Sequence, residues 1–263
     1  RRKWMSQLTD HLHPLFVRPE TAVTVFYFPK GYLPWWHSFC RPSVVTIHDT
    51  IIQYDEDHYP TWRKPREYAY WARLLKHTLR HADHIMTVSQ SSRRQIEEFM
   101  SRHGIPRNDI TVTYEPCIHE EIPQPENPAK ENYVIHLASC EPHKRSAHLI
   151  RWWHLAEQKG RRLPTLHLIG SVPPEVEPLL ASARTIVKRP FLDDPALQAA
   201  YLQARALILP SEIEGFGLPA LEAYYLGTPV CYVSGTSVEE VLSVATDKGS
   251  FTLDDLDSLF AAL

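Results

Sequence analysis

This chain of 263 residues has few glycines, no closely spaced cysteines, no long apolar run and no excess of positive charge. It has nine glycines, and its four cysteines (Cys40, Cys117, Cys140 and Cys231) are far apart. Such spacing matches neither a disulfide framework nor a metal or redox motif, and it favours a cytoplasmic protein. Because 28 Lys and Arg stand against 31 Asp and Glu, we do not expect a nucleic-acid partner. No apolar run is long enough to span a bilayer, so any membrane contact is expected to be peripheral, on the cytoplasmic face.

The order of strand-like and helical patterns predicts an α/β fold with parallel sheets. The proline-rich stretch 123–128 cannot sustain a helix or a central strand, so we place a linker there. This divides the chain into an N-terminal domain, 1–127, and a C-terminal domain, 128–263. The predicted strands are 23–28, 44–47, 84–88, 110–113, 133–138, 166–169, 206–209 and 230–233. The predicted helices are 65–81, one that Ser92 caps and that ends near Arg102, 147–157, 195–204 with Asp194 as its candidate cap, 219–226 and 254–263.

Two carboxylates bracket a glycine loop in the second half of the chain. Glu214 and Glu222 are separated by seven residues, and an apolar strand-like run precedes them. Gly215 and Gly217 leave the backbone bare, so that its N–H groups can approach a ligand closely. Pro219 suits the start of a helix, and a helix N-terminus favours anions such as a diphosphate. The alternative is an exposed acidic helix start, which dipole effects alone also favour.

The run EGFGLPALEA, with these two glutamates, resembles the signature of family-four retaining glycosyltransferases. That resemblance implies a GT-B fold, in which two Rossmann-like domains with parallel sheets face a central cleft. It also implies that Glu222 binds the ribose hydroxyls of a nucleotide sugar. The residues that it assigns to the donor sugar and its diphosphate are Glu214, Gly215, Phe216, Gly217, Leu218 and Lys144.

Lys144 lies in a segment, Glu141-Pro142-His143-Lys144, that resembles the family's Glu-Pro-Arg-Lys. The resemblance puts Lys144 at the donor diphosphate. His143 stands where the family commonly has arginine, so Arg145 and Arg189 are further candidates to share the phosphate. A solvated basic loop is the alternative.

In the first half, the strand-like run 44–47 ends in His48-Asp49, as does a strand of the family. By resemblance His48 lies near the donor sugar as a catalytic residue, with Asp49 as a further candidate. In the alternative, Asp49 binds turn backbone and His48 is incidental.

A basic, aromatic segment spans residues 62–81. It could lie on anionic lipid or be an ordinary amphipathic helix with its aromatic residues packed inward. Its basic residues are Arg63, Lys64, Arg66, Arg73, Lys76 and Arg80, and Tyr68, Tyr70 and Trp71 lie among them.

Together these features predict a retaining glycosyltransferase that moves a sugar from a nucleoside diphosphate sugar to a hydroxyl of a saccharide or lipid-linked saccharide. We expect it to act in polysaccharide or glycoconjugate assembly, with Glu214 and His48 catalytic and with no metal or cofactor. The alternative is a non-catalytic sugar-nucleotide-binding or scaffold subunit of a glycosyltransferase complex, and a third hypothesis is a sugar-nucleotide epimerase. The family's N-terminal glycine-rich loop and C-terminal crossing helix are not apparent, so we expect the chain to be incomplete at both ends.

Overall fold

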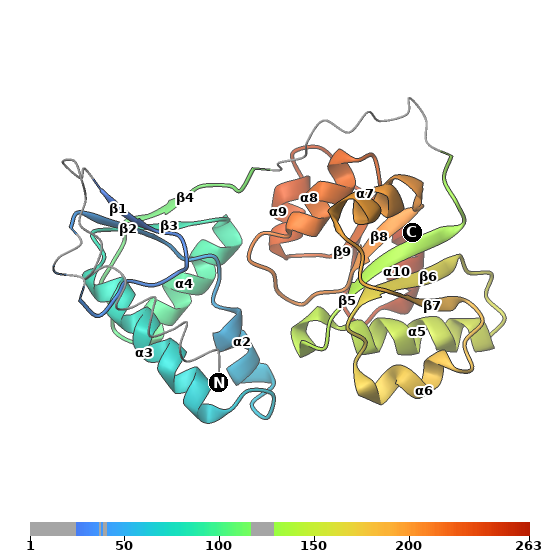
Figure 1. Ribbon diagram of the computed structural model, residues 1–263, viewed down its shortest axis with the longest axis horizontal. Coiled ribbons are helices and arrows are strands. Elements are labelled where there is room, and N and C mark those ends of the chain that lie inside the picture. The colour runs from blue at the N-terminus through green and yellow to red at the C-terminus, as the bar shows by residue number, and fades with distance from the viewer. Residues whose placement is uncertain (1–24, 37, 39–40, 117–128) are drawn as a thin grey trace. The chain divides into compact units, whose positions relative to one another are not determined.

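The computed structural model describes residues 25–36, 38, 41–116 and 129–263, and its elements are drawn in Figure 1. The chain divides into two compact units, Arg1–Tyr114 and Glu115–Leu263. Both units are α/β, with parallel sheets, as the sequence predicts. The predicted boundary at residue 127 and the linker 123–128 lie outside the described residues.

Unit 1 contains a parallel sheet whose four strands follow chain order, β1-β2-β3-β4. Its core lies between the sheet and α3 and α4, which supply Leu75, Leu79, Ile96 and Phe99. The apolar residues of α3 recur every three or four positions, so one stripe of the helix faces the sheet. The elements are β1 (Phe26–Phe28), β2 (Ser43–Thr46), α2 (Ile51–His58), α3 (Pro65–His81), β3 (His84–Thr87), α4 (Gln90–Arg102) and β4 (Ile110–Val112).

The predicted caps of two helices are wrong by one or more residues. Ser89, not Ser92, is the N-cap of α4, and its hydroxyl accepts a hydrogen bond from the Ser92 N–H at 2.9 Å. The backbone at Ser89 is extended, as is typical of an N-cap residue, and the helix begins at the next residue, three positions after the end of β3. In the same way Asp193, not Asp194, caps α7 through the N–H of Ala196.

Unit 2 contains a parallel sheet of six strands in the order β10-β9-β8-β5-β6-β7. The strands are β5 (Tyr133–Ala138), β6 (Thr165–Gly170), β7 (Ile186–Arg189), β8 (Ala206–Leu209), β9 (Val230–Val233) and β10 (Ser250–Phe251). The helices are α5 (Ser146–Gln158), α6 (Glu177–Leu180), α7 (Asp194–Gln203), α8 (Leu218–Tyr225), α9 (Ser237–Leu242) and α10 (Leu256–Ala262), with short 3-10 turns η2 (Pro142–Lys144) and η3 (Pro174–Val176).

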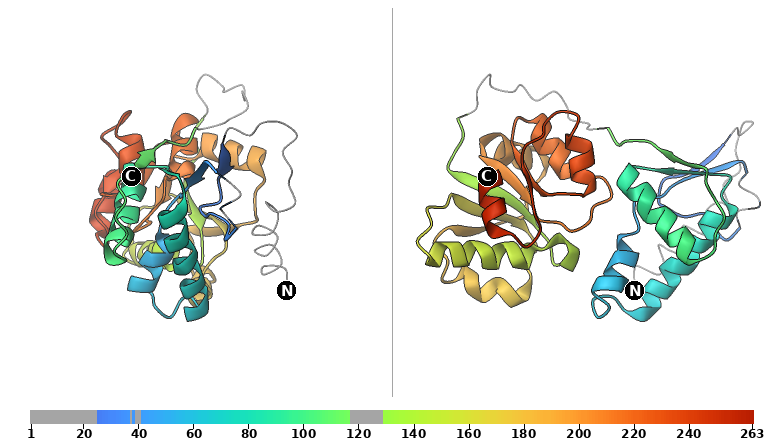
Figure 2. Two further views of the ribbon diagram at one scale, coloured as in Figure 1. Left: turned by 90° about the vertical axis from the view of Figure 1, so that its left-hand side faces the viewer. Right: turned by 180° about the vertical axis from the view of Figure 1, so that it is seen from behind.

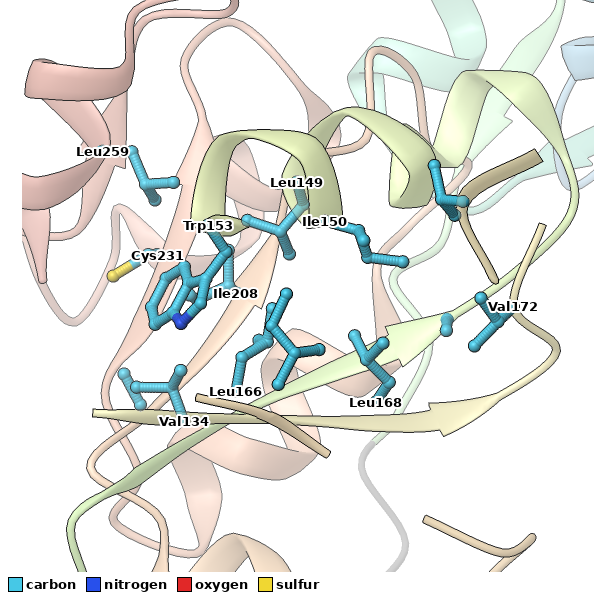
Figure 3. Packing of buried hydrophobic residues seen from close by; sticks show 14 of the residues in the cluster. Val134, Leu149, Ile150, Trp153, Leu166, Leu168, Val172, Ile208, Cys231 and Leu259 are labelled. Carbon is cyan, nitrogen blue, oxygen red and sulfur yellow. The ribbon is translucent and has the colours of Figure 1, made fainter. Parts of the chain in front are cut away.

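Helices cover both faces of this sheet (Figures 1 and 2). On one face, Leu149, Ile150 and Trp153 of α5 point toward residues of β5, β6 and β8, as Figure 3 shows. On the other face, Tyr201 of α7 and Ala220 of α8 belong to a second buried cluster. Strands buried on both faces are nearly all apolar, which explains why β5, β8 and β9 have the bounds that the sequence predicts.

Several short elements were not predicted: α2, α6, α9, β7 and β10. β7 is an edge strand that ends in the exposed, charged Lys188 and Arg189, and such strands lack the apolar pattern of a central one. None of the helices within the described residues is long and apolar enough to cross a membrane.

Candidate functional site

The two loops with the sequence-predicted residues follow neighbouring strands of unit 2. β5 and β8 pair in parallel, so the β5 loop (139–145) and the β8 loop (210–217) leave the same edge of the sheet. Strand order also reverses here, because β6 and β7 lie on one side of β5 while β9 and β10 lie beyond β8. Counted from β5, this is the 3-2-1-4-5-6 order of a Rossmann fold, which binds ligands at the reversal. The fold therefore places both loops where a ligand site is expected.

The centre of this candidate site is an ion pair between Lys144 and Glu214. The lysine Nζ lies 2.8 Å from each carboxylate oxygen of Glu214, and the side chains are only 29% and 11% exposed. An ammonium group that faces a crevice can bind an anion, and a carboxylate can accept hydrogen bonds from sugar hydroxyls. The site thus has one group for each part of a ligand that combines phosphate and sugar.

One backbone hydrogen bond joins the two loops beside this ion pair, and a serine hydroxyl supports the β8 loop. The N–H of Glu212 in the β8 loop donates to the carbonyl of His143 in the β5 loop at 2.9 Å. The buried Ser237 of α9 donates its hydroxyl to the carbonyl of Glu214 at 3.1 Å. These contacts keep Lys144 and Glu214 in place, which preorganises the site.

Gly217 ends the β8 loop and precedes the first residue of α8. Its φ is +96°, and an added Cβ would lie 2.7 Å from a side-chain carbon of Val238. Both the left-handed backbone and the close packing therefore require glycine. Phe216 is buried while Leu218 is 38% exposed, and Pro219 occupies the second helical position rather than the first.

A buried histidine that the sequence did not single out supports the β5 loop. His136 of β5 lies 2.9 Å from the carbonyl of Ile208 through Nδ1 and 2.8 Å from the hydroxyl of Ser146 through Nε2. The same hydroxyl accepts from the N–H of Ser139 at 2.9 Å. The carbonyl of Ile208 can only accept, so Nδ1 carries the ring proton, and the Ser146 hydroxyl donates to the unprotonated Nε2. Burial, with the nearby charge of Lys144, lowers the pKa of His136 to about 4, so the ring is neutral. Only its place in an otherwise apolar strand could have revealed it.

Arg145 follows Lys144 but takes part in different contacts. Its guanidinium lies 3.2 Å from Glu212 and also pairs with Asp254, and its side chain is 10% exposed. Arg145 and Asp254 both have positive φ, at 55° and 63°. The structure therefore places Arg145 between two carboxylates, neither of which the sequence predicted as a partner.

Glu222 and Arg189 lie on other elements of unit 2. Glu222 is half-buried in α8, about one turn from Gly217. Arg189 ends the edge strand β7 and lies 3.4 Å from His167, whose pKa burial and the Arg189 charge lower to about 4. Arg189 is thus two strands away from β5, whereas Glu222 is on the helix that begins at the site.

His48 and Asp49 lie in unit 1, in the segment between β2 and α2. His48 is exposed, and its Nε2 lies 2.9 Å from the carbonyl of Pro29. Asp49 accepts a hydrogen bond from the N–H of Ile51 at 3.0 Å, which is a backbone turn contact of the kind the alternative describes. Their roles in a reaction stay predictions. Within the described residues no group of three or more His, Cys, Asp or Glu side chains could hold a metal ion.

Comparison with known proteins identifies the family of the chain. Residues 37–249 match a family model described as "Family 4 Glycosyltransferase in conflict systems". The chain belongs to the family-4 glycosyltransferases. The predicted family is thereby confirmed.

Two curated members of similar sequence are mannosyltransferases. The chain is 29% identical to O-antigen chain mannosyltransferase B of Escherichia coli over 239 residues, which are 84% of this chain and 60% of that protein. It is 27% identical to the MMP alpha-(1->4)-mannosyltransferase of Mycolicibacterium hassiacum, over 84% of this chain and 56% of that protein. This family-4 chain therefore spans a little over half the length of these relatives.

Solved structures share its fold at low sequence identity. WaaG, a glycosyltransferase involved in lipopolysaccharide biosynthesis, aligns with a TM-score of 0.68 and 16% identity, over 98% of this chain and 71% of WaaG. The sucrose-phosphate synthase of Thermosynechococcus elongatus aligns with a TM-score of 0.61 and 18% identity, over 84% of this chain and 57% of that one. At these identities the likeness establishes the fold, which is the predicted GT-B type.

Proposed function

We propose that this family-4 chain acts as a retaining, metal-independent glycosyltransferase that uses a nucleoside diphosphate sugar. The observation that supports this most is the Lys144–Glu214 pair at the point where strand order reverses. A phosphate and a sugar are adjacent in such a donor, as the ammonium and carboxylate groups are in the site. Relatives named as O-antigen mannosyltransferases favour a saccharide acceptor in glycan assembly.

In the proposed reaction, the bond between the anomeric carbon and the diphosphate oxygen breaks while a bond to the acceptor oxygen forms on the same face. The nucleoside diphosphate leaves, and its phosphate oxygen takes the proton of the acceptor hydroxyl. Lys144 and the first N–H groups of α8 would neutralise the charge that develops on the leaving diphosphate. Their positive charge could do this without a metal ion.

The other predicted residues would orient the donor. Glu214 would accept hydrogen bonds from sugar hydroxyls and tolerate positive charge on the ring, while Glu222 would bind the ribose diol. The close loop at Gly215 and Gly217 would let backbone N–H groups reach the sugar phosphate. His48 remains the candidate from unit 1 for contact with the donor sugar, and Asp49, Arg145 and Arg189 remain secondary candidates.

A calorimetric titration tests the donor site. The chain is titrated with the diphosphates of uridine, guanosine, adenosine and thymidine, beside Glu222→Gln. We expect one ribonucleotide to bind preferentially, and the variant to weaken it about tenfold, the loss typical of a hydrogen bond to a charged group. A Glu222→Gln variant with the parent's affinity would remove Glu222 from the ribose site.

The sugar conjugate of the nucleotide that binds is then incubated with the chain and a saccharide acceptor, and the products are analysed. Free nucleoside diphosphate together with a glycosylated acceptor indicates transfer, whereas an altered sugar indicates an epimerase. NMR of the anomeric proton distinguishes retention from inversion, and activity in EDTA tests metal independence. Glu214→Ala should lower the turnover about a hundredfold. Selective nucleotide binding with no transfer to any saccharide would favour the non-catalytic subunit instead.

We also propose that α3 gives unit 1 a peripheral contact with an anionic membrane. Arg66, Arg73 and Arg80 are exposed and spaced seven residues apart, so they lie along one side of the helix. The guanidinium of Arg73 lies 5.5 Å from the ring centre of Trp35, and Trp35 and Trp36 are partly exposed. Tryptophan beside arginine suits a lipid headgroup region. Tyr68 and Trp71, by contrast, pack against the core, as the alternative expects.

A further inference from the structure

Tyr201 of α7 has a buried hydroxyl group with no hydrogen-bond partner among the described residues. The side chain is 1% exposed and belongs to the cluster that includes Ala220 and Ala223 of α8. A polar group that leaves water without a partner destabilises the folded state. Phenylalanine would fill the same space without this cost, so the hydroxyl needs an explanation.

Other tyrosines of the chain satisfy their hydroxyl groups within the protein. Tyr68 donates to Gln53 at 2.8 Å, Tyr133 to the carbonyl of Ala200 at 2.8 Å, and Tyr224 to the carbonyl of Ala245 at 3.3 Å. Tyr201 therefore differs from Tyr68 of unit 1 and from Tyr133 and Tyr224 of unit 2.

Glu222 is the charged residue of α8, and it is next in sequence to Ala223 of the same buried cluster. Burial raises the pKa of Tyr201, and the negative charge of Glu222 raises it further. The two residues lie on α7 and α8, which pack against each other. The packing of the two helices thus places a phenol that can donate one hydrogen bond on α7 and a carboxylate that can accept several on α8.

We propose that Tyr201 is a positioning residue, whose hydroxyl donates a hydrogen bond to Glu222 when a nucleotide binds and holds that carboxylate toward the ribose. The inference rests on the proposed function, since it needs Glu222 to bind a ribose diol. Glutamate has several rotatable bonds, and a buried neighbour that holds one carboxylate oxygen reduces the freedom lost on binding. One oxygen would then remain directed at the two ribose hydroxyls.

The variant Tyr201→Phe separates this role from a structural one. Because it removes an unsatisfied buried hydroxyl, its unfolding temperature should equal or exceed that of the parent chain. Its Kd for the nucleoside diphosphate that the parent binds, measured by calorimetry with GDP and UDP, should rise about tenfold. In turnover assays KM for the donor should rise while kcat stays the same. Tyr224→Phe, which loses a hydroxyl on α8 outside the site, should keep the parent's Kd.

A double-variant cycle with Glu222→Ala identifies the partner. In the Glu222→Ala background, Tyr201→Phe should cause no further loss of nucleotide affinity. The 2′,3′-dideoxy form of the same nucleotide should bind the parent and Tyr201→Phe equally.

Each contrary outcome has a distinct meaning. Equal affinity of the parent and Tyr201→Phe would overturn the inference and leave the proposed function intact, and so would losses that add fully in the double variant. A parent chain that binds neither GDP nor UDP nor the other diphosphates would overturn the donor site itself, and the role of Tyr201 with it.

Discussion

The two units differ in the order of their strands, and this difference accounts for where the candidate site lies. The strands of unit 1 follow chain order, and its described core lies on the face that α3 and α4 cover. In unit 2 the order reverses between β5 and β8, and helices cover both faces. Right-handed crossovers that continue in one direction keep helices on one face, whereas a reversal moves them to the other face and opens a crevice.

The units also place their buried charges differently. In unit 1 the fully buried Asp55 pairs with Arg63 and thereby connects α2 to the segment before α3. In unit 2 the partly buried charges Lys144, Arg145 and Glu214 lie in loops at the carboxyl ends of strands. The pair in unit 1 joins a helix to a neighbouring segment, while the charges in unit 2 lie at strand ends, where ligands bind in such folds. The comparison predicts that substitutions in the loops of unit 2 affect transfer most.

The largest effect is expected for Lys144→Met. Loss of the cation at the leaving phosphate should lower the transfer rate by a factor of about 100 to 1,000, as the loss of other preorganised groups does. Lys188→Met is the matched control, because this exposed lysine of β7 pairs with Glu177 away from the site. Steady-state assays with both variants check this, and a similar loss for Lys188→Met would break the assignment.

Gly217→Ala should destabilise unit 2 by about 3 kcal/mol. The alanine would be strained in the left-handed backbone conformation, and its Cβ would clash with Val238. Gly227→Ala provides the control. Its φ is +74°, but an added Cβ meets no atom within 4 Å, so we expect about 1 kcal/mol from backbone strain alone. Urea unfolding measures both values. Equal losses would mean that contact with Val238 does not restrict the β8 loop.

Acid should destabilise unit 2 through His136. The ordinary pKa of histidine is 6.5, and the pKa of the buried His136 is about 4, so between these values the unfolded chain binds a proton that the folded chain does not. Stability therefore falls as the pH drops from about 7 to 4, by about 3 kcal/mol for this residue. Urea unfolding at several pH values should show a shallower decline for His136→Asn, which keeps a donor for Ile208. An unchanged slope in that variant would contradict the neutral, buried ring.

The smallest effect is expected for the surface of unit 1. Arg73→Gln should weaken binding to vesicles with anionic lipid about fivefold, because one basic residue near such a surface contributes about 1 kcal/mol. Arg94→Gln removes an exposed arginine of α4 and should leave vesicle binding unchanged. Sedimentation with anionic and with neutral vesicles provides the measurement. No preference of the parent chain for anionic vesicles would exclude the proposed contact.

Much of the fold could be predicted because long elements have a strong local pattern. The bounds of α3, β5, β8 and β9 agree with the prediction, since each has a sustained apolar period or a wholly buried run. The short β7 and β10 were missed, because edge strands of two to four residues carry little pattern. The predicted caps at Ser92 and Asp194 were wrong because neighbouring residues could cap equally well, and the end of the preceding segment decided between them.

For the candidate site, the chain's motifs identified Lys144, Glu214 and Glu222, but not what surrounds them. Lys144 and Glu214 are 70 positions apart in the sequence, and the pairing of β5 with β8 brings them together. His136, Glu212 and Asp254 support the loops without belonging to any motif. The hydroxyl of Tyr201, which has no partner among the described residues, is visible only when α7 and α8 are packed.

The amino-acid sequence by itself determined the alternation of strands and helices, the glycine loop and the family. Those properties depend on the period of apolar residues and on residue types a few positions apart, which the local chain already contains. The tertiary structure decided the strand order, the partners of Arg145 and the neutral state of His136. Strands pair through backbone groups that are the same in every residue, and charged side chains acquire partners and burial only after that pairing brings distant segments together.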